Sequence, residues 1–166
     1  MKVQAFIGIG SNLGDRLVHC RAALDRLVLL PGTTVKRISP FFESEPQEGV
    51  KGGLFLNAVA EIATGLPPHQ LLGHLQEIEA ALGRSPDHLP RTARTIDLDI
   101  LLYGDTVMHE PDLTIPHPRM AARRFVLVPL VALASTVRHP VLKVTAIELL
   151  QRLGPEHPAA VSGMQR

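Results

Sequence analysis

Two aspartates separated by a single residue, Asp97 and Asp99, lie among apolar residues in the stretch RTIDLDILLYGD. In an extended strand alternate side chains share one face, so both carboxylates project to the same side. At a rise of about 3.3 Å per residue their Cα atoms lie about 6.6 Å apart, and two carboxylates at this spacing can hold one divalent cation or a pair of them. The spacing therefore predicts a metal platform. Aspartates on an exposed edge strand can also serve only solubility, and the pattern alone does not separate the two.

The apolar residues of the same stretch predict which face of the strand packs against the core. Alternation places Leu101 beside the two aspartates. It places the other apolar residues on the opposite face, and these are Ile96, Leu98, Ile100 and Leu102. We therefore expect a core on one side of this strand and a ligand on the other.

Cationic side chains are concentrated on both sides of the aspartate pair along the chain. Carboxylates with a metal beside several guanidinium groups suit a polyphosphate substrate, because the metal bridges phosphate oxygens and arginine neutralises the rest. Flanking prolines fix the backbone of His117, which makes this residue a candidate phosphate contact. Any single arginine could instead be a solvated surface charge. The cations are Arg84, Arg91 and Arg94 before the pair, and His117, Arg119, Arg123 and Arg124 after it.

Composition limits the class of protein. The chain has 166 residues, with 17 Lys and Arg against 16 Asp and Glu, so overall charge favours neither a nucleic-acid nor a membrane partner. The single cysteine, Cys20, cannot form an internal disulfide, which fits a reducing cytoplasm. The sequence shows neither a signal peptide nor a zinc, P-loop or nucleophile–base motif. We expect a cytoplasmic monomer with one domain over residues 1–154 and a loose tail over 155–166.

Hydrophobic periodicity predicts the elements that position these groups. Their order is β-α-β-β-α-β, which is the ferredoxin-like α+β arrangement of an antiparallel sheet. Both helices should cover one face and leave the other open, so that Phe55 and Asn57 project beside the aspartates. The expected strands are 3–9, 34–42, 54–64 and the aspartate stretch, and the expected helices are 16–30 and 67–82, with two further helices after residue 117 and at 145–153.

Several segments together resemble one enzyme family, 6-hydroxymethyl-7,8-dihydropterin pyrophosphokinase of folate biosynthesis. The segments are GSNLGDR, FLNAVAEI, RTIDLDILLYGD and LTIPHPRMAARRFVLVPL, and the resemblance extends from about Val3 to Leu150. It implies a ferredoxin-like enzyme that transfers the β,γ-diphosphoryl group of ATP to the hydroxymethyl group of 6-hydroxymethyl-7,8-dihydropterin and releases AMP. It also implies two Mg²⁺ ions, with ATP as co-substrate.

The resemblance also implies a role for individual residues. Asp97 and Asp99 match the pair that holds the two Mg²⁺ ions. Arg84 and Arg94 join this pair as catalytic residues, and the segments Glu43–Gly53 and Arg84–Ala93 match mobile covers of the site. The ATP-binding positions are Gln76, Glu79, Arg84, Arg94, Ile100, His117 and Arg123. The pterin-binding positions are Ser44, Phe55, Asn57 and Phe125.

The chain departs from the family pattern before the aspartate strand and again at Asp112, where the family often has a basic residue. An Arg-Trp-Gly-Pro-Arg run usually precedes the aspartate strand, but this chain has LPRTAR there and contains no tryptophan.

Two other functions also fit a ferredoxin-like sheet with two carboxylates: a palm-like nucleotidyltransferase, and a ligand-sensing module without catalysis.

Overall fold

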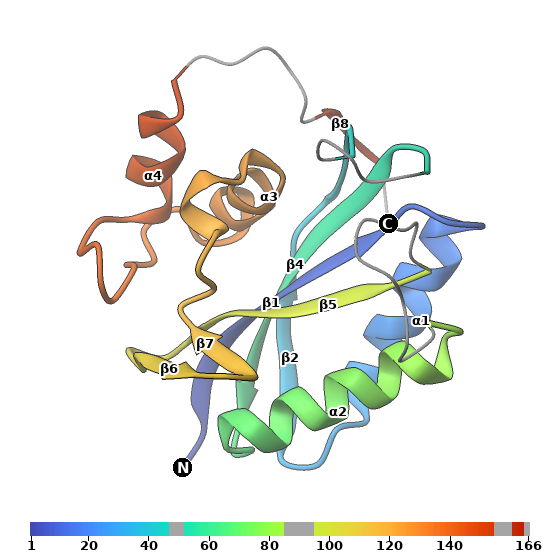
Figure 1. The fold of residues 1–166 in the computed structure, drawn as a ribbon, viewed down its shortest axis with the longest axis horizontal. Coiled ribbons are helices and arrows are strands. Elements are labelled where there is room, and N and C mark those ends of the chain that lie inside the picture. The colour runs from blue at the N-terminus through green and yellow to red at the C-terminus, as the bar shows by residue number, and fades with distance from the viewer. Residues whose placement is uncertain (47–51, 85–94, 155–160, 165–166) are drawn as a thin grey trace.

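A computed structural model of the chain describes residues 1–46, 52–84, 95–154 and 161–164. A six-stranded antiparallel sheet forms its centre, in the order β5-β1-β4-β3-β8, with β2 also paired to β4 (Figure 1). The strands are β1 Val3–Ser11, β2 Thr33–Ile38, β3 Phe41–Ser44, β4 Phe55–Thr64, β5 Asp97–Tyr103, β6 Met108–Glu110, β7 Leu113–Ile115 and β8 Val161–Met164. The helices are α1 Arg16–Val28, α2 Pro68–Ala81, α3 Arg124–Ala134 and α4 Ala146–Arg152, with a 3₁₀ turn, η1, at Met120–Ala122.

Local chemistry accounts for where the helices begin. The Asp15 side chain accepts a hydrogen bond from the Val18 amide at the start of α1, and Pro68 opens α2, where no amide partner is needed. At α4, Thr145 and Glu148 form a reciprocal capping box. These features agree with the helices expected from the sequence.

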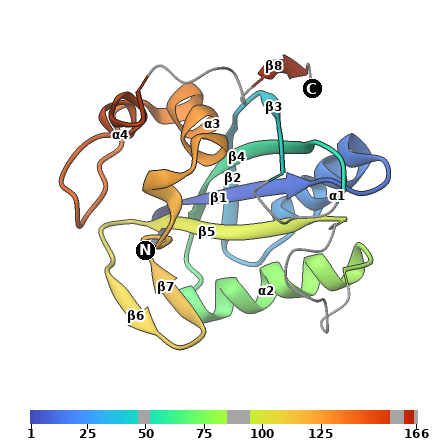
Figure 2. The same ribbon diagram turned by 45° about the horizontal axis from the view of Figure 1, so that its top comes forward.

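The sheet confirms the predicted ferredoxin-like arrangement. β2 and β3 both pair with β4 and act as one strand that is interrupted at Ser39 and Pro40. Counted this way, the fourth core strand lies beside the first, and the first lies beside the third. The two crossover helices, α1 and α2, pack on one face against a continuous apolar core. Figure 2 shows α2 on that side of the sheet.

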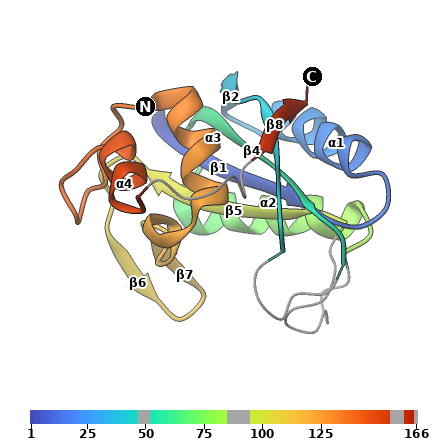
Figure 3. The same cartoon turned by 90° about the horizontal axis from the view of Figure 1, so that it is seen from above.

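The second face is not open along its whole length, which corrects one expectation. A separate core packs α3 and α4 onto part of this face (Figures 2 and 3). Helical periodicity shows that α3 has apolar residues to bury, but it does not show which sheet face they cover. The uncovered part lies toward the start of β5 and the end of β1. The second core consists of Phe6, Val59, Leu101, Leu102, Met120, Val126, Leu130, Leu133 and Ala146.

A β-bulge in β5 corrects the predicted alternation. Phe6 pairs with Leu102 and Ile7 pairs with Ile100, so Leu101 is an extra residue in β5. Leu101 and Leu102 therefore both contribute to the second core, whereas Leu102 was expected beside Ile100. The alternation expected for Asp97 to Ile100 holds.

The C-terminal segment contains a strand that the sequence did not predict. Residues 161–164 form β8, which pairs with β3, although no core pattern was visible after Gly154. The division of the chain at residue 154 stays a prediction. Among the described residues, none of the helices is both long and apolar enough to span a membrane.

Candidate active site

The two aspartates lie on the uncovered part of the second face, as their spacing predicted. Asp97 pairs with Gly10 and Asp99 pairs with Gly8, both on β1. Across β1, Gly10 also pairs with Asn57 on β4. Directly opposite residues in an antiparallel ladder share a face. The carboxylates of Asp97 and Asp99 and the amide of Asn57 therefore lie on either side of β1, which has no side chains at Gly8 and Gly10. The face therefore has a shallow floor between them.

Arg84 connects the aspartate strand to helix α2. Its Nη1 donates to Asp97 Oδ1 at 2.5 Å and to Glu79 Oε2 at 2.9 Å. The same Glu79 oxygen accepts from the Leu98 amide at 2.8 Å. Arg84 and Glu79 side chains are only 11% and 15% exposed, so these charge-assisted bonds are poorly screened. Glu79 thereby fixes β5 between the two aspartates.

Two acidic groups of the site, Asp99 and Glu79, have a raised pKa. Burial is the main cause that raises the pKa of Asp99 well above its ordinary value, and the negative charges of Asp97 and Glu79 add to the effect. The guanidinium groups of Arg123 and Arg84 oppose it. Burial also raises the pKa of Glu79. A site of this kind favours an added cation, because a cation stabilises the ionised carboxylates.

His117 has a fixed position and a fixed tautomer. Its amide donates to the Leu101 carbonyl at 2.9 Å, so the bulge in β5 holds the residue beside the aspartates. Its Nδ1 accepts from the Arg119 amide at 3.2 Å, which leaves the ring proton on Nε2. Burial, followed by the charges of Arg123 and Arg119, lowers the pKa of His117 to about 4. The imidazole is therefore neutral at pH 7 and can donate through Nε2.

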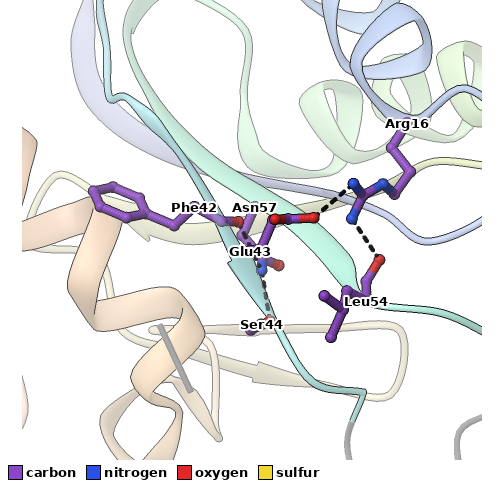
Figure 4. Close-up of polar contacts among 6 residues, drawn as sticks. All are labelled: Arg16, Phe42, Glu43, Ser44, Leu54 and Asn57. Carbon is purple, nitrogen blue, oxygen red and sulfur yellow. Dashed lines mark hydrogen bonds and ion pairs between the residues drawn. The ribbon is translucent and has the colours of Figure 1, made fainter. Parts of the chain in front are cut away.

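The polar groups expected to bind the pterin meet on β3 and β4. Asn57 Nδ2 donates to Ser44 Oγ at 2.7 Å and makes a longer contact of 3.4 Å to the Phe42 carbonyl (Figure 4). Asn57 and Ser44 are 5% and 4% exposed. Phe55 is half-buried and lies on the same face of β4 as Asn57. On the helical side, the Arg123 guanidinium lies 5.4 Å from the centre of the Phe125 ring.

Not every predicted residue has its side chain at this face. Ile100 is 4% exposed within the core under α1 and α2, so any nucleotide contact there is left to its backbone. Gln76 is exposed on α2, one turn before Glu79. Arg94 lies outside the described residues, as do residues 47–51 and 85–93 of the two expected covers.

Three residues at this face were missed by the sequence argument. Gly8 and Gly10 were interpreted only as part of a strand and a turn, although their lack of side chains shapes the floor. A Cβ on Gly10 would lie 3.5 Å from Asn57 Oδ1 and 3.7 Å from Phe55 Cδ1. Phe42 pairs with Asn57 and extends toward α3 (Figure 4). The alternation of β3 was the pattern that could have identified Phe42.

Comparison with known protein families matches residues 6–135 to the model for 7,8-dihydro-6-hydroxymethylpterin-pyrophosphokinase, or HPPK. A 2-amino-4-hydroxy-6-hydroxymethyldihydropteridine pyrophosphokinase of Pseudomonas aeruginosa is 42% identical over 137 residues, which are 82% of this chain and 84% of that protein. The Bacillus subtilis protein of the same name is 40% identical over 133 residues, which are 80% of this chain and 79% of that protein.

Other similar proteins are much longer than this chain. The folic acid synthesis protein fol1 of Schizosaccharomyces pombe is 40% identical over 149 residues, which cover 90% of this chain but 20% of that protein. A crystal structure of Plasmodium falciparum HPPK-DHPS with pteroate matches with a TM-score of 0.74 at 14% identity, over 92% of this chain and 44% of the other. At this identity the structural match concerns the fold alone.

Proposed function

The chain belongs to the 7,8-dihydro-6-hydroxymethylpterin-pyrophosphokinase family, and we propose that the uncovered face of its sheet is where it transfers the pyrophosphoryl group of ATP to hydroxymethyldihydropterin. This transfer is the family's step in folate synthesis. The oxygen of the pterin hydroxymethyl group bonds to the β-phosphorus of ATP and loses its proton to solvent, the bond from that phosphorus to the α-phosphate oxygen breaks, and AMP leaves. The observation that supports this location best is the pairing of Asp97 and Asp99 on a face that also holds cations and a neutral hydrogen-bonding pair.

We propose that Asp97 and Asp99 hold Mg²⁺, as two ions. The residues fit this metal, because carboxylate oxygens are its preferred protein ligands and the acidic surroundings of Asp99 favour an added cation. When bound, Mg²⁺ neutralises charge on the phosphate oxygens. Arg84 contacts Asp97, so its guanidinium lies beside the carboxylate where Mg²⁺ would bring a phosphate.

Phosphate binding is completed by neutral and cationic donors from the segment before α3. His117 offers a neutral Nε2 proton, whereas Arg123 offers a guanidinium that lowers the pKa of His117. Arg94 is proposed as a further phosphate contact by its match to the family pattern. Gln76, Glu79 and the backbone of Ile100 are proposed at the nucleotide. Fixed donors orient the transferred group and stabilise its charge, so positioning and electrostatic stabilisation together supply the catalysis.

The pterin ring is proposed to bind between Phe55 and Phe125, with its polar edge on Asn57 and Ser44. The Asn57 Nδ2 group is oriented by Ser44 Oγ and the Phe42 carbonyl, which leaves Oδ1 for the ligand. A flat heterocycle gains from stacking on aromatic rings. Since Gly10 has no side chain at this point, a ring can approach the sheet closely.

One assay separates this function from its two alternatives. The protein is incubated with ATP, Mg²⁺ and 6-hydroxymethyl-7,8-dihydropterin, and the nucleotide products are separated. Release of AMP with a pyrophosphorylated pterin is the expected result. Release of pyrophosphate would instead indicate a nucleotidyltransferase, and intact ATP would indicate a ligand-sensing module.

Oligomeric state and location stay predictions. We propose a monomer in the cytoplasm that binds neither nucleic acid nor membrane. Light scattering on the purified protein, with and without ATP, tests the first point. A stable dimer in that measurement would contradict it.

A further inference from the structure

Arg16, the last residue of the segment GSNLGDR, has no role in the function proposed above. It is the first residue of α1, on the face of the sheet that the pterin does not use. A cation in the first turn of a helix is unfavourable, because the helix dipole places partial positive charge there. The residue is therefore not explained by the stability of α1.

The guanidinium of Arg16 connects strand β3 to the residue that immediately precedes β4. Its Nη2 forms an ion pair of 2.6 Å with Glu43 Oε2, and its Nη1 donates to the Leu54 carbonyl at 2.9 Å (Figure 4). Glu43 is on β3, and Leu54 immediately precedes β4. The side chains of Arg16 and Glu43 are 26% and 22% exposed, so this pair is screened less than a fully exposed one.

The two residues that Arg16 contacts lie next to the residues proposed to bind the pterin. Ser44 pairs with Phe55 on the last rung between β3 and β4. Glu43 immediately precedes Ser44, and Leu54 immediately precedes Phe55. Neighbouring residues in a strand face opposite sides. Arg16 therefore contacts Glu43 and Leu54 on the α1 side of the sheet, while the paired residues Ser44 and Phe55 face the proposed ligand.

We propose that Arg16 is a positioning residue for the pterin site. It fixes the end of β3 against the start of β4, and so sets the distance between Phe55 and the pair formed by Ser44 and Asn57. This inference rests on the proposed pterin site, and Arg16 itself does not touch the substrate. A planar guanidinium reaches both acceptors at once, whereas an ammonium in the same place is a single point charge.

Arg16→Lys tests the inference, and Arg37→Lys is its matched control. Arg37 also forms an ion pair between neighbouring strands, with Glu61 on β4, away from the pterin groups. Pterin binding is titrated for each folded variant with Mg²⁺ and an ATP analogue that cannot transfer its pyrophosphoryl group. We expect Arg16→Lys to weaken pterin binding about tenfold, since one hydrogen bond to a charged group is worth about a decade in an equilibrium constant. ATP binding should change less than about twofold, and Arg37→Lys should match the parent in both titrations.

Hydrogen exchange provides a measurement that does not depend on the substrate. Amides of β3 and of the first residues of β4 should exchange faster in Arg16→Lys than in the parent, and those of β5 should not. Unchanged pterin binding in a folded Arg16→Lys would overturn the inference, as would equal losses for pterin and ATP. A parent protein that forms AMP but binds no pterin at this face would overturn the proposed site, and this inference with it.

Discussion

The two ends of the uncovered face differ in how their side chains are held. At the β5 end, Arg84 forms short ionic contacts with both Asp97 and Glu79, and the pKa of Asp99 is raised by burial and by neighbouring carboxylates. At the β3 end, Ser44 and Asn57 are neutral, buried and bonded to each other. The first end contains charges that favour a cation, whereas the second contains a neutral hydrogen-bonded pair.

This difference predicts that the two ends respond differently to substitution. Removing a charge from the β5 end changes the electrostatic field at the transferred phosphate. This field stabilises the charge of the transition state, so its loss lowers the rate of the chemical step. Removing a group from the β3 end changes ring stacking or one hydrogen bond, which act mainly on binding. The β5 end should therefore control turnover, and the β3 end should control pterin affinity.

The largest effect is expected at the aspartates. Asp97→Asn or Asp99→Asn should keep the fold, because both side chains face the uncovered side, and should lower turnover by at least about a hundredfold through lost metal binding. Steady-state rates at saturating Mg²⁺, together with the unfolding temperature, measure both effects. Near-normal turnover in either folded variant would contradict the metal assignment.

The next effect concerns the ring stacking at the other end. Stacking on an aromatic ring is worth about 1–3 kcal/mol by alanine substitution, so Phe55→Ala should weaken pterin affinity roughly 5- to 150-fold at about 1.4 kcal/mol per decade. ATP affinity should barely change. Calorimetric titration of the variant with each ligand measures this, and Phe42→Ala shows whether a further aromatic residue of this face contributes. A folded Phe55→Ala protein with parental pterin affinity would remove Phe55 from the pterin site.

Asn57→Ala should have a smaller effect on pterin affinity, of about tenfold for one polar contact. It also leaves the buried Ser44 hydroxyl without its 2.7 Å donor, which should cost about 1–3 kcal/mol of unfolding free energy. Denaturant unfolding of Asn57→Ala, Ser44→Ala and the double variant measures the coupling. Additive losses in stability would show that the two side chains do not support each other.

Sequence patterns were sufficient where local rules determine the structure. Alternation placed Asp97 and Asp99 on one face and Phe55 with Asn57 on the same face, and all four hold in the structure. The rule failed for Leu102, because the bulge at Leu101 reverses the alternation. A bulge depends on the partner strand, so it is not visible in the strand's own sequence.

Sequence patterns also could not predict contacts between segments that are distant in the chain. The Arg16–Glu43 pair joins residues 27 positions apart, and composition shows only that both signs of charge are present. Similarly, Leu54 was expected in the core but is 43% exposed, because the paired strand begins one residue later. Such features depend on how the elements are brought together, which propensity and periodicity do not encode.

The smallest effect is expected from His117 and concerns acid stability. Its pKa is lowered to about 4 in the folded protein, from an ordinary value of 6.5. Below pH 6.5 the unfolded chain therefore takes up a proton that the folded chain does not, so stability should fall as pH decreases from 6.5 toward 4 and be fully present above this range. His117→Gln should reduce this part of the acid sensitivity, whereas His109→Gln, at an exposed position in β6, serves as the control. Chemical unfolding at several pH values between 4 and 7.5 measures the slopes. Because Nδ1 accepts from the Arg119 amide, the neutral ring is the form that the fold selects. Equal slopes for His117→Gln and the parent would show that His117 does not cause the acid sensitivity.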